Sequence, residues 1–327
     1  MNYRRFGKTN LKISEISLGT WQLGGKWGDE FNNDVAFKTL ESAYEKGINC
    51  FDTADVYQGQ ESEKAIGKFI KTKDNPPFVI TKTGRQISPH TADGYNEENL
   101  RKFINDSRKR LQVDALDMVL LHCPPTEVYY QPHIFKLLDK FKEEGLIKRY
   151  GVSVEKIEEG LKAMNYSGVE AIEIIFNMFR LRPAELFFEE AKKHNVAVIV
   201  RVPLASGLLT GKFDKNTKFG PNDHRTFNRE GEAFDKGETF SGVDYKQGLQ
   251  AVEELKQVFK TDNLAPYALR YILMYDAVST VIPGASKESH IINNVKAIDL
   301  PELTKKQMSE IKRIYDKYIK DPVHHLW

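Results

Sequence analysis

The amino-acid sequence predicts one α/β domain spanning residues 1–327, a (β/α)8 TIM barrel with an N-terminal hairpin and a long loop after the seventh strand. Short apolar runs alternate with amphipathic segments of helical period along most of the chain. Each run is nearly all apolar, as expected for a parallel strand covered on both faces. Eight such runs can be placed, and a barrel of this kind takes about 250 residues and accepts insertions, so 327 residues suffice.

The remaining elements can be assigned in chain order. Residues 3–14 alternate around a turn at 7–10 and predict a small hairpin that plugs the bottom of the barrel. One helix is expected from a cap at Asp34 to a stop at Gly47, and another begins at Glu97 and Glu98, where acidic side chains suit the helix dipole. The strands are expected to end near positions 19–20, 51–52, 82, 122, 153, 176–177, 202 and 282.

The regular alternation stops after Val202. Residues 213–244 are rich in Gly, Asp, Asn and Phe and show no steady period. Loops longer than about 12–15 residues are usually functional or disordered, which predicts one of these two kinds of loop at this point. Two helical segments, near 246–259 and 264–274, then precede the eighth apolar run at 279–282.

Composition excludes several classes of partner. Lys and Arg total 48 against 46 for Asp and Glu, and no basic block is present, so nucleic acid is not expected to bind. The first ten residues lack the apolar core of a signal peptide, and no run approaches the roughly 18 apolar residues of a membrane span. A cytoplasmic protein without a membrane partner is therefore expected. Cys50 and Cys123 have no metal-binding spacing, so reduced cysteines and no metal site are predicted.

Four polar residues, Asp52, Tyr57, Lys82 and His122, lie at or just beyond the ends of three consecutive strand-like runs, where such barrels assemble their chemistry. A phenol has a pKa of about 10, so Tyr57 needs a partner such as Lys82, held by Asp52, to stabilise its phenolate. His122 could then orient a carbonyl group. Each residue also has a purely structural interpretation. Asp52 and Lys82 could form an ordinary salt bridge at the barrel rim, His122 could be a core histidine with satisfied hydrogen bonds, and Tyr57 could be an aromatic residue of a loop.

Six motifs in order resemble the aldo-keto reductases: LGTWQLGG at 18–25, FDTADVY at 51–57, ITK at 80–82, LLHCPP at 120–125, SGLLTGKF at 206–213 and IPGAS at 282–286. By that resemblance Tyr57 is the proton donor, Lys82 and Asp52 tune it, His122 orients a small carbonyl substrate, and NADPH supplies the hydride. The resemblance places the NADP(H) site at Gly19, Thr20, Trp21, Asp52, Ser153, Glu173, Arg201, Pro203, Leu204, Ser206, Gly207, Leu208, Gly211, Lys212, Gly284, Ser286, Lys287, His290, Asn293 and Asn294.

Two of these segments also carry chemistry of their own. Residues 207–212 lack the spacing of a P-loop, yet their backbone N–H groups and Lys212 can reach a pyrophosphate; a plain glycine-rich turn is the alternative. Ser286 and Lys287 stand at the start of a helical segment, where N–H groups favour an anion such as a 2′-phosphate. The alternative there is an ordinary capped helix with a solvated lysine. No G-x-G-x-x-G fingerprint of a Rossmann site is present.

Four positions depart from the family pattern: Val154 replaces Asn, Glu173 replaces Gln, Arg201 replaces an aromatic residue, and His290 replaces Arg or Gln. The loss of Asn predicts one contact fewer to the nicotinamide carboxamide. Glu173 and Arg201 could be a structural ion pair. Alternatively, the guanidinium stacks on the cofactor ring or reaches an anionic substrate.

The expected function is therefore NADPH-dependent reduction of an aldehyde or ketone to an alcohol, with Tyr57 as general acid. Two alternatives are a Schiff-base aldolase that uses Lys82 as nucleophile and a nicotinamide-binding regulatory subunit with little turnover. Trp21, Trp27, Tyr129 and the long loop are expected to select the substrate. The sequence leaves open the substrate itself, the oligomeric state and the role of the C-terminal Trp327.

Overall fold

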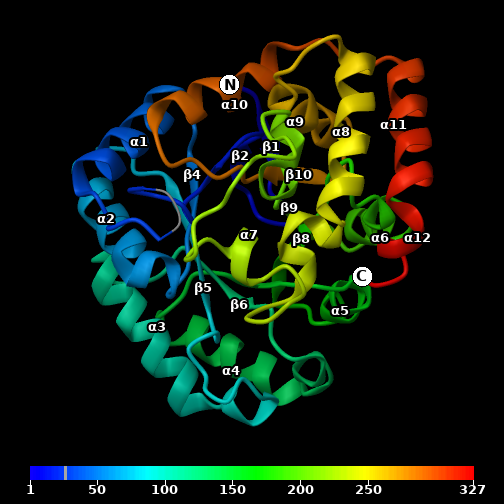
Figure 1. Ribbon diagram of the computed structural model, residues 1–327. Helices are drawn as coiled ribbons and strands as arrows, with labels where there is room; N and C mark the ends of the chain where they lie inside the picture. Colours follow the sequence, from blue (N-terminus) through cyan, green and yellow to red (C-terminus); the bar gives the residue numbers. More distant parts are fainter. Residues whose placement is uncertain (26–27) are drawn as a thin grey trace.

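The computed structural model describes residues 1–25 and 28–327, and within them eight parallel strands form one curled sheet (Figure 1). The strands follow one another in chain order: β3 (Leu18–Gly19), β4 (Cys50–Asp52), β5 (Phe78–Thr83), β6 (Met118–His122), β7 (Tyr150–Ser153), β8 (Val169–Ile175), β9 (Ala197–Arg201) and β10 (Val278–Val281). Parallel bridges join Ile16 to Val281 and Gly19 to Gly284, so the two edges of the sheet meet. The predicted (β/α)8 barrel is confirmed.

All the described helices except α7 (His224–Phe227) surround the barrel on the outside, as Figure 1 shows. None in the described residues is both long and apolar enough to cross a membrane. Their bounds are α1 (Asn33–Glu45), α2 (Glu61–Ile70), α3 (Glu97–Leu111), α4 (Pro132–Glu143), α5 (Ile157–Ala163), α6 (Phe187–Lys193), α7 (His224–Phe227), α8 (Tyr245–Phe259), α9 (Ala265–Leu273), α10 (Glu288–Asp299), α11 (Lys305–Tyr318) and α12 (Lys320–Val323).

The start of α1 differs from the prediction. Asn32, not Asp34, is the N-cap, and its side chain accepts a hydrogen bond from the backbone N–H of Val35 at 3.0 Å. Asp34 lies inside the first turn, where its negative charge still suits the helix dipole. The sequence offers three successive cap-forming residues, Asn32, Asn33 and Asp34, and in the structure the side chain of Asn32 makes the capping hydrogen bond. Gly47 follows the end of α1 with a φ of +79°, as predicted for a helix stop.

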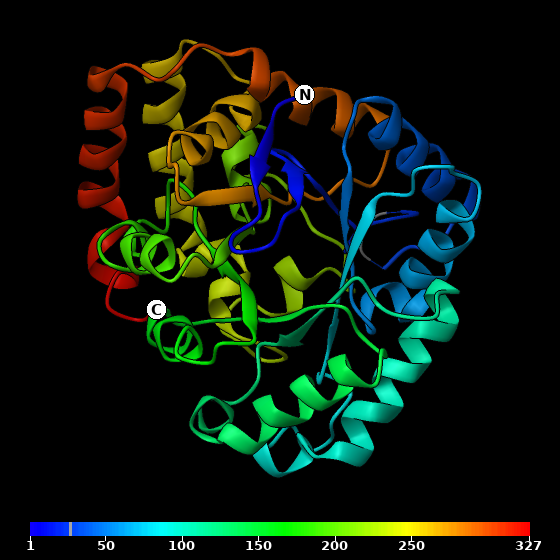
Figure 2. The same ribbon diagram turned by 180° about the vertical axis from the view of Figure 1, so that it is seen from behind.

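The N-terminal hairpin is confirmed. Its strands β1 (Tyr3–Arg5) and β2 (Lys12–Ser14) pair antiparallel, and Phe6 and Ile13 belong to the apolar cluster inside the barrel. Gly7 is required at the turn because it has a φ of +54° and an added Cβ would lie 2.5 Å from the backbone nitrogen of Ala197, at the start of β9. Figure 2 shows the hairpin, in dark blue, across the end of the barrel that is turned away in Figure 1.

The apolar side chains of the strands form two separate layers, one outside and one inside the barrel. Val79, Val119 and Leu121 point outward to the helices, whereas Ile80 and Leu120 point into the barrel. This is the two-residue alternation of a β-strand, with both faces buried. The interior is therefore filled by side chains, and polar groups on the inward face can gather only at the end that the hairpin does not close.

The residues 213–244, called the mouth loop below, cross that open end. The loop contains α7, η6 (Lys236–Glu238) and η7 (Phe240–Gly242), and Figure 1 shows α7 over the middle of the barrel. The C-terminal Trp327 is 5% exposed and binds this loop: its indole Nε1 donates to Asp235 Oδ1 at 2.8 Å, and its ring packs 3.9 Å from the guanidinium carbon of Arg180. Trp327 thus holds the mouth loop and does not hang in solvent.

Candidate active site

The inward-facing ends of five strands supply the polar groups of the barrel mouth. Each of these strands has an apolar residue inside the barrel and a polar residue two positions later. The pairs are Cys50 and Asp52, Ile80 and Lys82, Leu120 and His122, Ala171 and Glu173, and Ile199 and Arg201. Because side chains alternate along a strand, a spacing of two keeps each polar residue on the inward face. All five are buried, with relative exposures of 7% or less.

Asp52, Tyr57 and Lys82 are in direct contact. The Nζ of Lys82 donates to both carboxylate oxygens of Asp52, at 2.7 and 2.6 Å, to the backbone oxygen of Thr53 at 3.1 Å, and to the hydroxyl of Tyr57 at 3.2 Å. Tyr57 begins η1 (Tyr57–Gln60), directly after β4. The rings of Tyr57 and His122 meet edge to face with centroids 5.8 Å apart. The structure thus brings together the four residues that the sequence singled out as catalytic.

Burial determines the protonation of this group. It raises the pKa of Tyr57; Lys82 acts in the opposite direction, and Asp52 and Glu173 add to the increase. The phenol is therefore protonated, and the expected lowering of its pKa by Lys82 is outweighed. Burial opposes the charge of Lys82, but Asp52 and Glu173 more than offset it, so the pKa of Lys82 is raised and the amine is a cation. Burial also raises the pKa of Asp52, with Glu173 adding to the effect and Lys82 opposing it.

His122 is a neutral imidazole. Burial lowers its pKa well below the ordinary value, and the cations Arg85, Lys82 and Arg201 lower it further. Its Nδ1 atom is buried and has no hydrogen-bond partner among the described residues. A neutral imidazole carries one N–H, which is enough to donate to a carbonyl oxygen in the cavity.

Glu173 and Arg201 form a weaker pair than the sequence suggested. Their closest atoms, Arg201 Nε and Glu173 Oε1, are 4.0 Å apart. The guanidinium instead donates to Glu155 Oε2 at 2.8 Å and to the backbone oxygen of Val154 at 3.0 Å. Glu173 accepts a hydrogen bond from Ser153 Oγ at 3.2 Å, and its other oxygen lies 3.5 Å from Lys82 Nζ. The nearest hydrogen-bond acceptors of Arg201 are therefore Glu155 and Val154, not Glu173.

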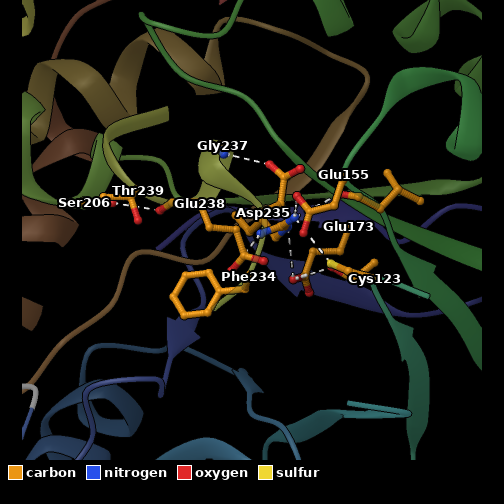
Figure 3. A network of polar contacts seen from close by, with 12 residues as sticks. Cys123, Glu155, Glu173, Ser206, Phe234, Asp235, Gly237, Glu238 and Thr239 are labelled. Atoms are coloured by element: carbon orange, nitrogen blue, oxygen red, sulfur yellow. Dashed lines mark hydrogen bonds and ion pairs between the residues drawn. The ribbon is translucent and has the colours of Figure 1, made fainter. Parts of the chain in front are cut away.

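A buried network connects Arg201 to the mouth loop, as Figure 3 shows with Glu238 and Asp235 of the loop facing Glu155 of the barrel. Glu238 pairs with Arg85 at 2.5 Å and with Arg201 at 3.6 Å. Burial acts to raise the pKa of Glu238, but Arg85 and Arg201 outweigh it and bring the pKa to about 2. Burial raises the pKa of Glu155 to about 8, against the influence of Arg201. Glu155 therefore holds a proton at neutral pH, and Glu238 does not.

The sequence pattern alone does not reveal this network, although it marks part of it. Arg85 follows Lys82 by three residues and Glu155 follows Ser153 by two, so both stand just past strand ends that had been identified. Glu238 lies in a segment without period, and no local signal marks it. Cys123, Glu155 and Glu238 bring their ligand atoms within 4.8 Å of one another, yet guanidinium groups already contact all three, which leaves the set unsuited to a metal cation.

One cavity of about 970 Å³ extends from Tyr57 and His122 to α10, between the barrel mouth and the mouth loop. It is lined by sixteen of the twenty residues predicted for the cofactor: Gly19, Trp21, Asp52, Glu173, Arg201, Pro203, Leu204, Ser206, Gly207, Lys212, Gly284, Ser286, Lys287, His290, Asn293 and Asn294. The mouth loop adds Phe213, His224, Arg225 and Glu238, which the sequence analysis did not single out.

Four predicted cofactor residues lie behind the cavity wall instead. Thr20 is buried and its hydroxyl donates to the backbone oxygen of Asp52 at 2.7 Å, whereas Ser153 donates to Glu173. Leu208 packs in the core, and Gly211 has a φ of +77° with an added Cβ 2.3 Å from the backbone oxygen of Asp262. These residues shape the wall; they do not line the cavity.

The residues expected to select a substrate are placed differently from one another. Trp21 lines the cavity, stacks on Tyr57 with ring centroids 6.1 Å apart and meets His224 at 4.9 Å. Tyr129 is fully buried, and its hydroxyl donates to the backbone oxygen of Ser153 at 3.4 Å, so its prediction as a pocket residue is wrong. Trp27 lies outside the described residues.

The far end of the cavity suits an anion. Lys287 is the N-cap of α10, and the N–H and hydroxyl of Ser286 lie 3.3 and 3.4 Å from Nδ1 of His290. Burial lowers the pKa of His290, and Lys287 and Lys212 lower it further, so the imidazole is neutral among two cations. An added Cβ on Gly284 would meet nothing within 4 Å, which leaves room for a ligand beside α10. Cations, a helix N-terminus and open space fit a phosphate group.

Comparisons with known proteins match nearly the whole chain. The model of the "Aldo/keto reductase family" matches residues 15–316. The chain is 26% identical to "Aldo-keto reductase YhdN" of Bacillus subtilis (strain 168) over 333 residues, 99% of this chain and 96% of that protein. Two solved structures are each 25% identical. They are the glycerol dehydrogenase AKR11B4 from Gluconobacter oxydans (TM-score 0.79, covering 99% and 98% of the two chains) and the holo form of AKR11C1 from Bacillus halodurans (0.75, 96% and 96%).

Proposed function

The chain belongs to the aldo/keto reductase family, and on this premise we propose that it reduces an aldehyde or ketone to an alcohol with NADPH, using Tyr57 as the general acid. The observation that carries the proposal is the contact of Lys82 Nζ with both Asp52 and the Tyr57 hydroxyl at one end of a large cavity. This arrangement combines a protonated phenol with a cation that can stabilise its phenolate. We also propose that residues 1–327 form a single barrel domain.

The proton transfer can be followed from the contacts. Tyr57 donates its hydroxyl proton to the carbonyl oxygen of the substrate, and Lys82, 3.2 Å away, stabilises the phenolate that forms. Asp52 holds the ammonium group in place through two hydrogen bonds. His122 donates its one N–H to the same carbonyl oxygen and orients it. Bound NADPH supplies the hydride.

The residues at the cavity wall fit this cofactor. Lys287, Ser286 and the N-terminus of α10 would hold the 2′-phosphate, and Lys212 would reach the pyrophosphate. At the other end Glu173 would accept a hydrogen bond from the amide N–H groups of the nicotinamide, because its Oε2 atom has no hydrogen-bond partner among the described residues. Val154 presents no side-chain donor there, as expected from the replacement of Asn.

A Schiff-base aldolase is disfavoured by the same geometry. A nucleophilic lysine must be a neutral amine, and Lys82 is held as a cation between Asp52 and Glu173.

The proposal for a reductase is tested by following NADPH absorbance against a panel of aldehydes and ketones, with identification of the alcohol product. Loss of NADPH absorbance with formation of alcohol is expected for some members of the panel. Absence of turnover across the panel, despite cofactor binding, would contradict the proposal and favour a regulatory subunit.

A further inference from the structure

Glu173 places a second carboxylate beside the catalytic lysine. It lies on β8, is 1% exposed, and brings its Oε2 atom to 3.5 Å from Lys82 Nζ. Ser153 donates to Oε1 at 3.2 Å, which fixes the orientation of the side chain. At this position the resemblance to the family predicts a neutral glutamine. The chain therefore has one buried negative charge more at the lysine than the family pattern would provide.

The neighbouring charges do not cancel Glu173. The groups that face it are Asp52 from β4, Tyr57 from η1, Lys82 from β5 and Arg201 from β9. Arg201, at 4.0 Å, is already engaged by the mouth-loop network described above, so little of its charge is available. Lys82 is the nearest cation, and it is shared with Asp52 at 2.6 Å. Two carboxylates thus compete for one ammonium group that a phenolate also needs.

We infer that Glu173 is a positioning residue that keeps Tyr57 in its protonated, proton-donating form by drawing on the charge of Lys82. This inference deepens the proposed function and rests on it. A phenolate on Tyr57 would face Asp52 and Glu173 with one lysine between all three groups, and its formation is correspondingly unfavourable. Tyr57 therefore stays a proton donor to a higher pH than it would beside a glutamine. Carbonyl reduction, which needs the phenol, therefore continues to a higher pH, and alcohol oxidation, which needs the phenolate as base, begins at a higher pH.

The direction agrees with the electrostatics of Tyr57. Burial raises its pKa most, Lys82 lowers it, and Glu173 is among the groups that raise it further. Glu238 is buried like Glu173 and Glu155 is partly exposed, and both carboxyl groups face Arg201 and Arg85. They therefore provide matched controls for a carboxylate that does not contact the lysine.

The inference is tested on the full-length protein without substrate, through the ultraviolet absorbance of the Tyr57 phenolate. The signal of each variant is measured at one fixed alkaline pH and corrected by the same variant carrying Tyr57→Phe. A charge within about 4–6 Å moves a pKa by roughly 1–3 units. At a pH below the midpoint of both proteins, where only a small fraction of Tyr57 is ionised, a shift of one unit changes that fraction about tenfold, so Glu173→Gln is expected to raise the Tyr57-dependent phenolate signal roughly tenfold over wild type. Glu173→Asp, which keeps the charge, and Glu155→Gln, which changes a carboxyl group elsewhere, are expected to stay close to wild type.

Steady-state pH profiles provide a second measurement in both reaction directions. In Glu173→Gln, the alkaline decline of carbonyl reduction and the alkaline rise of alcohol oxidation should both move to lower pH by about one unit or more. An unchanged phenolate signal in Glu173→Gln, or an equal increase in Glu155→Gln, would overturn the inference. Because the phenolate measurement needs no turnover, its outcome is separate from failure of the reductase assignment itself, which would appear as an absence of activity in wild type. Near-ultraviolet circular dichroism verifies that each variant is folded.

Discussion

The Nζ atom of Lys82 donates a hydrogen bond to the hydroxyl of Tyr57 across 3.2 Å, although the two residues are 25 positions apart and lie on different elements. Lys82 is fully buried, whereas Tyr57 is half-buried at the cavity, and burial is still the largest influence on the pKa of Tyr57. A phenol in this position donates a proton only when a neighbouring cation can stabilise the product. The contact supports the assignment of Tyr57 as general acid and can be tested directly.

Tyr57→Phe removes the donated proton and little else. The variant should lower kcat by at least about 100-fold, the scale for loss of a general acid, and leave NADPH affinity nearly unchanged. Steady-state kinetics with a good aldehyde and fluorescence titration of NADPH measure the two effects. Near-normal turnover in the variant would show that another group protonates the carbonyl.

Lys287→Ala tests the anion site at the N-terminus of α10. A charge-assisted contact to a 2′-phosphate contributes about 1.5–3 kcal/mol, so NADPH binding should weaken roughly tenfold or more while NADH binding barely changes. The matched control is Lys306→Ala, which changes an exposed lysine on α11 and should leave the affinities for NADPH and NADH unchanged. Equal losses for NADPH and NADH would mean that Lys287 does not recognise the phosphate.

Arg201 should bias the site toward the reduced cofactor if its guanidinium lies at the nicotinamide. Two unit charges 4 Å apart interact by roughly 4 kcal/mol at an effective dielectric of about 20, so even a screened remnant changes a ratio of affinities severalfold. Wild type should bind NADPH better than NADP⁺, and Arg201→Tyr should narrow the difference. The structure makes Glu238, not Glu173, the suitable counter-charge variant, because Glu238 is ionised and contacts Arg201 directly through the mouth-loop network. Glu238→Gln should widen the difference.

Calorimetric titration of both nucleotides against wild type, Arg201→Tyr and Glu238→Gln measures these ratios. If neither substitution changes the NADPH/NADP⁺ ratio, Arg201 and its carboxylates form a structural network without influence on the cofactor.

Glu155 should make the protein less stable as the pH rises. Its pKa in the fold is about 8 against an ordinary 4.5, so between these values the folded state holds a proton that the unfolded state has lost. The contribution of Glu155 to the free energy of unfolding is thus fully present below pH 4.5 and falls as pH rises toward 8, by at most about 1.4 kcal/mol per pH unit. Urea unfolding at several pH values should show a smaller decline for Glu155→Gln than for wild type. Identical slopes for the two proteins would contradict a protonated Glu155 in the folded state.

Much of the site could be predicted because it follows from local rules. Parallel strands place their C-terminal ends at one edge, and a spacing of two from an apolar interior position keeps a polar side chain facing inward. Asp52, Lys82 and His122 satisfy both conditions, and Tyr57 is only five positions beyond Asp52. The barrel, the N-terminal hairpin and the mouth loop follow in the same way from runs of apolar residues and from the point at which their period stops.

Other relationships required the folded chain because they join segments that no local pattern connects. The sequence suggested that Glu173 neutralises Arg201, yet Glu238, 37 positions beyond Arg201 in a loop without period, and Glu155 are its nearer partners. Because Arg201 contacts these two residues more closely, the nearest cation to Glu173 is Lys82. The role of Trp327 was left open by the sequence. In the structure its indole N–H donates a hydrogen bond to Asp235 of the mouth loop, 92 positions earlier in the chain. Sequence alone therefore determined which strand-end residues gather at the barrel mouth, since strand periodicity is local. Tertiary packing decided which loop residues line the cavity and which charges meet, since electrostatic pairing depends on distances in space.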